Sequence, residues 1–134
     1  MSKILLIDSN VLLRHILDDH PDQSQKAKAF MDKVKDGEIT AKIIEGVLVE
    51  CVYVLLKVYE VPRVEIAGVL VDILEYIGIT RENKSVYITG LKNFANNRVD
   101  IVDNLLAAFA EGDKELVSFD QDFAGLNIKT YRLS

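Results

Sequence analysis

The feature that most constrains the fold is an alternation of short β-rich runs with longer segments of helical spacing. Residues 3–7 ("KILLI") and 115–119 ("ELVSF") are mainly apolar runs of strand length. Between them, apolar residues recur every three to four positions, as on one face of a helix. Strands separated by helices favour parallel pairing, because each helix returns the chain to the same end of the sheet. The pattern therefore predicts an α/β fold with a parallel sheet.

Apolar spacing and turn residues define the expected elements. The segment 43–59 is ambiguous, because its Val and Ile content favours a strand while its length favours a buried helix, which we choose. Gly37 and Gly78 are expected to end two helices, and Ser9 or Asn10 to cap the first. We expect strands at 3–7, 38–41, 115–119 and 128–133, and helices at 11–17, 22–35, 43–59, 64–77, 86–97 and 100–111. The first strand could be buried on both sides.

Composition narrows the class of protein. At 134 residues and 49% hydrophobic content, the chain is expected to form one domain, 1–134, around a single core. A net charge of −5 argues against general binding of polyanions. The single cysteine, Cys51, excludes an internal disulfide and a thiolate zinc site, and it fits a cytoplasmic location. The longest apolar run contains Glu45, Glu50 and Lys57, so no membrane span is expected.

Two aspartates stand where expected strands end. Asp8 follows the first strand and Asp120 follows the strand at 115–119. In open α/β sheets, ligands bind beyond the carboxyl ends of the strands. If the two strands are neighbours, both carboxylates point into one crevice. Taken alone, each aspartate could equally be an ordinary turn or helix-cap residue.

Further acids lie at the starts and faces of the predicted helices. Glu50 shares a helical face with valines, which would carry its carboxylate into apolar surroundings, where it needs a cation, hydrogen-bond donors or a raised pKa. A buried salt bridge is the alternative. Glu45 is interpreted as a first-turn residue favoured by the helix dipole. Asp100 and Asp103 lie three positions apart; one is expected to cap the helix, and Asp103 is the better inward candidate.

Carboxylates that converge on one crevice repel each other, and a divalent cation is the usual remedy. Mg²⁺ and Mn²⁺ prefer hard oxygen ligands, and the chemistry that suits such a site is attack on a phosphodiester. A nucleotide-binding domain would need a Gly-rich turn where this chain has "DSNVLL", and a haloacid-dehalogenase-like phosphatase would need Asp where it has Asn10. A non-catalytic α/β interaction module remains an alternative. His15 and His20 are expected on helix surfaces without a catalytic role.

Four segments together resemble a PIN-domain nuclease of the VapC-like toxin branch. They are "LLIDSNVLLR", "EGVLVECVYVLLKVYEV", "VDIVDNLLAAFA" and "LVSFDQDFAGL". The resemblance implies a Rossmann-like three-layer sandwich, a central parallel sheet flanked by helices, and Mg²⁺- or Mn²⁺-dependent endoribonuclease activity on RNA. A non-toxin PIN nuclease in RNA processing is the alternative. By the same resemblance, the catalytic and metal-binding acids are Asp8, Glu50, Asp103 and Asp120.

The resemblance also implies supporting residues and partners. Asn10 and Ser118 match polar positions that flank the first and last acids, and Arg14 matches a basic residue that closes the first motif. Asp122 is often acidic in relatives, so it is the alternative to Asp120. The implied partners are RNA, a second copy of the chain and a cognate VapB-like antitoxin. Because the chain is acidic, local cations such as Arg14 and Arg98 are expected to hold RNA.

Overall fold

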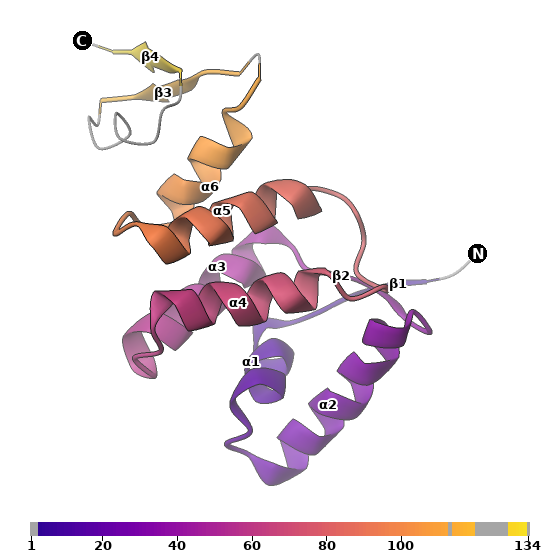
Figure 1. Ribbon diagram of the computed structural model, residues 1–134. Coiled ribbons are helices and arrows are strands. Elements are labelled where there is room, and N and C mark those ends of the chain that lie inside the picture. Colours follow the sequence, from indigo (N-terminus) through magenta and orange to yellow (C-terminus); the bar gives the residue numbers. More distant parts are fainter. Residues whose placement is uncertain (1–2, 113, 120–128, 134) are drawn as a thin grey trace.

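The computed structural model describes residues 3–112, 114–119 and 129–133, apart from the side chain of Arg132. These residues form α-helices, one π-helical turn and four short strands (Figure 1). The strands are β1 (Ile4–Leu6), β2 (Thr40–Lys42), β3 (Leu116–Ser118) and β4 (Thr130–Arg132). The helices are α1 (Ser9–Leu17), α2 (Pro21–Asp36), α3 (Glu45–Tyr53), α4 (Arg63–Leu74), α5 (Lys84–Asn96) and α6 (Ile101–Phe109). The predicted α/β class is confirmed, with small shifts of element boundaries.

The strands pair in parallel, as predicted, but the described residues form two separate two-stranded sheets. β1 pairs with β2, and β3 pairs with β4. On its other side β2 meets the segment after α4, where the Ala41 amide donates to the Gly78 carbonyl at 2.8 Å. A Cβ atom at position 78 would lie 2.0 Å from the carbonyl oxygen of Ile39, so only glycine fits there. Gly78 therefore allows its own backbone to lie close to the backbone of Ile39. It does not end α4, which stops four residues earlier, at Leu74.

The first strand is less buried than expected. Ile4 and Leu6 are 56% and 73% exposed, and only Ile7, just after β1, is buried. Within the described residues β1 has β2 as a neighbour on one side and no strand on the other, which leaves its apolar side chains uncovered. Figure 1 shows β3 and β4 beyond α6, apart from β1. The structure therefore does not place the strand at 115–119 beside the first strand.

The core lies between the helices. α5 packs against both α4 and α6, and α1 packs against α2. The largest side chains with essentially no exposed surface are Phe94, Leu12, Met31, Leu48, Leu55, Ile66, Leu70, Ile73, Leu74, Leu91, Ile101 and Leu105. None of the described helices is long and apolar enough to cross a lipid bilayer.

The end of the helix at 43–59 and the start of α1 differ from the predicted structure. The helical interpretation of 43–59 is confirmed, but its second half widens into a π-helical turn, Val54–Val58, in which the Tyr59 amide donates to the Val54 carbonyl at 3.3 Å. The capping prediction for Ser9 or Asn10 was wrong. Asp8 occupies the N-cap with an extended backbone, φ −78° and ψ 152°, and its side chain makes no cap hydrogen bond. The carboxylate that precedes α1 is thus not used to cap it.

Candidate active site at the carboxyl end of the first sheet

Parallel pairing brings the starts of α1 and α3 to one edge of the β1–β2 sheet. Asp8 immediately precedes α1, and Glu50 lies on α3, which follows β2. The two helices touch where the Cys51 thiol donates a weak hydrogen bond to the Ser9 carbonyl, at 3.8 Å. Burial, together with the negative charges of Glu50 and Asp8, raises the pKa of the Cys51 thiol to about 12. Asp8 and Glu50 immediately precede the two residues of this contact, Ser9 and Cys51, in the chain.

The surroundings of Glu50 differ from the prediction. Its side chain is exposed, because Val47 and Val54 on the same face are themselves only half-buried. A buried salt bridge is therefore excluded, and the carboxylate is open to a ligand. Asp8 is exposed as well. Cys51, in contrast, is fully buried.

Asp100 and Asp103 differ in their roles, and the prediction that one of them caps the helix is confirmed. Asp100 is the N-cap of α6: its carboxylate accepts from the Val102 amide at 2.9 Å and from the Tyr53 hydroxyl at 2.7 Å. Asp103 is half-buried in the first turn of α6. The hydrogen bond to Asp100, burial, and the charges of Asp100 and Asp103 together raise the pKa of Tyr53 to about 12. Since Tyr53 lies one turn after Glu50, α3 connects the two groups of acids.

Sequence reasoning missed the polar network that holds the start of α6. The Asn104 side chain is fully buried and donates to the carbonyls of Val99 and Asp100 at 3.0 and 3.2 Å. Its amide also pairs with that of Asn97. Arg63 stacks on Phe94, 3.8 Å from the ring centre, and donates to the Val99 carbonyl. An asparagine within the apolar run "IVDNLLAAF" was the available signal, because a buried amide needs partners.

Replacing Asp100 with alanine should lower stability without changing the chemistry. The variant loses the N-cap and leaves the Tyr53 hydroxyl without its acceptor, which we expect to cost about 1 kcal/mol of unfolding free energy. Urea denaturation measures this loss. Tyr53→Phe, which keeps the cap, should cost less than Asp100→Ala. Equal stability of Asp100→Ala and the wild type would contradict the capping role.

The remaining predicted residues include two that the structure does not describe. Asp120 and Asp122 fall outside the described residues, and Ser118 is half-buried on β3. Asn10 and Arg14 lie on the side of α1 that faces α2, and Arg14 pairs with Asp19 at 2.8 Å. Within the described ranges, no three His, Cys, Asp or Glu side chains gather closely enough to hold a metal ion.

The structure also describes the two histidines and Arg98, the second cation that was predicted to hold RNA. His20 is exposed, as expected, whereas His15 is half-buried and its Nε2 lies 3.1 Å from the Tyr76 hydroxyl. The surface prediction for His15 was therefore wrong, because α1 packs this side chain against the segment that follows α4. Arg98 is exposed and its charge acts on Arg63.

The available donors fit a hard divalent cation. Asp8 and Glu50 are exposed and immediately precede Ser9 and Cys51, which are in contact. The charge of Asp103, on α6, acts on Tyr53, which lies on α3 with Glu50. Mg²⁺ commonly takes one or two protein carboxylates and keeps several waters, so carboxylates are the type of donor that it uses.

A comparison with known protein families identifies the family to which the chain belongs. A family profile described as PIN domain matches residues 5–129, nearly the whole chain. The chain belongs to the PIN domain family. No curated protein and no solved structure matches it. PIN domains have a Rossmann-like α/β fold, which confirms the predicted fold class, and they are generally nucleases that act on RNA and depend on divalent metal ions.

Proposed function

We propose that this PIN domain is an endoribonuclease that depends on Mg²⁺ or Mn²⁺. The observation that carries the proposal is the contact of α1 with α3, where the Cys51 thiol meets the Ser9 carbonyl at 3.8 Å, because Asp8 and Glu50 immediately precede these two residues in the chain. Both side chains are exposed at the carboxyl end of the first sheet, where α/β folds bind their ligands. Asp103 is the proposed third acid, and Asp120, with Asp122 as alternative, the fourth.

Each residue would have a simple task. Asp8 and Glu50 present anionic oxygens from two different helices, and the packing of Cys51 beneath them holds those helices together. Asp103 is held at its place by the cap and amide network at the start of α6. A bound divalent cation would polarise the scissile phosphate and lower the pKa of a water molecule. The carboxylates would otherwise repel the phosphate, so they need that cation to act on RNA.

The purified protein should cleave single-stranded RNA in Mg²⁺ or Mn²⁺ and stop in EDTA. Carboxylates alone have no means of stabilising the charge that develops on the phosphate, so chelation should remove activity to the detection limit. Gel analysis of an end-labelled RNA measures this directly, and adding back Mn²⁺ should restore cleavage. Undiminished cleavage in EDTA would overturn the proposal.

The biological role proposed is that of a toxin in a type II toxin–antitoxin pair, acting as a homodimer. The support is the order and local context of the four acidic segments, which resemble VapC-like toxins. An antitoxin could neutralise the acids by inserting an Arg or Lys side chain among them, in charge-assisted hydrogen bonds. The alternative, a PIN nuclease of RNA processing, would be favoured if no antitoxin gene adjoins this one and expression does not arrest growth.

A further inference from the structure

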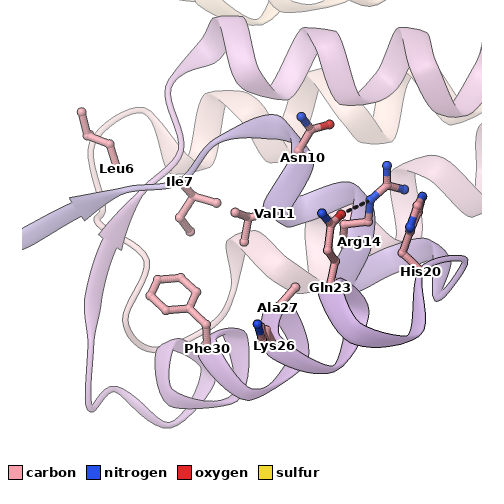
Figure 2. A pocket seen from close by; sticks show the side chains of 10 residues that line it. All are labelled: Leu6, Ile7, Asn10, Val11, Arg14, His20, Gln23, Lys26, Ala27 and Phe30. Atoms are coloured by element: carbon pink, nitrogen blue, oxygen red, sulfur yellow. Dashed lines mark hydrogen bonds between the residues drawn. The ribbon is translucent and has the colours of Figure 1, made fainter.

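A pocket between α1 and α2 has no role in the chemistry described above. It has a volume of about 650 Å³, within the range of small-molecule sites. Figure 2 shows that it is divided: Ile7, Val11 and Phe30 lie toward one end, and polar side chains gather at the other. Ile7 is buried, while Val11 and Phe30 are half-buried and leave part of their surface open to the pocket.

The polar end carries cations and amides. Arg14, His20 and Gln23 lie toward this end in Figure 2, with Asn10 at the start of α1, and the Arg14 Nε donates to the Gln23 side chain at 3.1 Å. Arg14 also pairs with Asp19, but these two bonds leave other guanidinium N–H groups for an anion.

The charge of the pocket is opposite to that of the chain. None of its described lining residues is acidic, although the whole protein has a net charge of −5. Lys26 also lines the pocket; it is exposed and forms no ion pair within the described part of the chain. An apolar floor with an aromatic ring, beside a cationic and amide rim, complements a ligand with one flat apolar face and one anionic group.

The pocket adjoins the proposed active site. Its lining residues Ile7 and Asn10 lie on either side of Asp8 in the chain. A strand of RNA bound at Asp8 would therefore have a neighbouring nucleotide within reach of the pocket.

We propose that this pocket is a subsite for one nucleotide of single-stranded RNA, next to the phosphate that is cut. The inference rests on the proposed nuclease function. The base lies against Phe30 and Val11, as unstacked bases do on aromatic side chains of RNA-binding proteins. Its phosphate lies beside Arg14 and Lys26, and the amides of Asn10 and Gln23 are placed to contact the base edge. The acidic chain thus holds RNA at a local cationic site.

The test separates RNA binding from cleavage. A fluorescent eight-nucleotide single-stranded RNA is titrated in EDTA, where no cut is expected, and fluorescence anisotropy gives its affinity. Lys26→Glu should weaken binding about tenfold and reduce the salt dependence by about one phosphate contact. Phe30→Leu keeps an apolar side chain but removes the aromatic face, and should weaken binding about fivefold. Amide shifts in NMR spectra on adding nucleoside monophosphates should centre on Val11 and Ala27.

The matched control is Lys33→Glu, the same charge reversal on an exposed residue of α2 that does not line the pocket. It should change affinity less than about twofold. If wild-type protein cleaves RNA but Lys26→Glu and Phe30→Leu bind it like Lys33→Glu, the subsite is refuted while the nuclease stands. Pocket-dependent binding without cleavage in Mg²⁺ would support the subsite and refute the nuclease. If the amide signals do not shift on adding RNA but do shift when the protein is diluted, the pocket is a contact with a protein partner and the inference is overturned.

Discussion

Asp8→Asn should abolish RNA cleavage while leaving the metal-free protein at least as stable as the wild type. Partners that merely orient metal ligands typically contribute 10- to 100-fold to metal affinity or activity, so loss of a direct ligand should exceed about 100-fold. The Asp8 side chain is exposed and makes no cap hydrogen bond, and asparagine serves equally well at an N-cap. Loss of its favourable position at the helix start is offset by relief of repulsion with Glu50.

The same helix supplies a control for Asp8→Asn. Asp18 stands at the other end of α1, is exposed, and has a positive φ of 54°, a conformation that asparagine also adopts readily. Asp18→Asn removes the same charge and should leave cleavage unchanged. Calorimetry with Mn²⁺ should show metal binding for Asp18→Asn and none for Asp8→Asn. A clear fall in the melting temperature of metal-free Asp8→Asn would instead indicate that Asp8 has a structural role.

Glu50→Gln should reduce cleavage by about two orders of magnitude, whereas Glu45→Gln should have little effect. Both residues are exposed on α3, so solvent accessibility does not separate them. Their positions differ: Glu45 lies in the first turn of α3, whereas Glu50 immediately precedes Cys51, whose thiol meets the carbonyl of Ser9, the residue after Asp8. Cleavage rates at saturating Mn²⁺ compare the two variants at equal net charge.

A second pair of variants extends this test to α6. Asp103→Asn should lose activity, whereas Asp100→Asn should retain it, because asparagine can still cap the helix and accept from the Val102 amide. Equal losses in Glu45→Gln and Glu50→Gln, or in both α6 variants, would show that the assignment of these acids is wrong.

The local sequence was sufficient to predict those structural features that depend only on residues close together in the chain. The alternation of apolar periods predicted the order of helices and strands, since burial of one face acts over a single element. The prediction that one of Asp100 and Asp103 caps α6 is confirmed for Asp100, because capping bonds reach only two or three residues along the chain. Gly37 ends α2 with a positive φ of 85°, as its lack of a side chain allows.

Other features were decided by tertiary structure. The sequence pattern suggested a first strand buried on both sides and a Glu50 in apolar surroundings, yet Leu6 and Glu50 are exposed, because burial depends on which elements cover a residue. The Cys51 contact with Ser9, which draws Asp8 and Glu50 together, joins residues 42 positions apart. His15 meets Tyr76 across 61 positions. The cationic pocket likewise exists only because α2 folds back onto α1. By itself, the sequence determined which acids are available and which elements carry them, since periodicity and capping are local. The packing of those elements decided which acids lie near one another, because such proximity depends on contacts between distant segments.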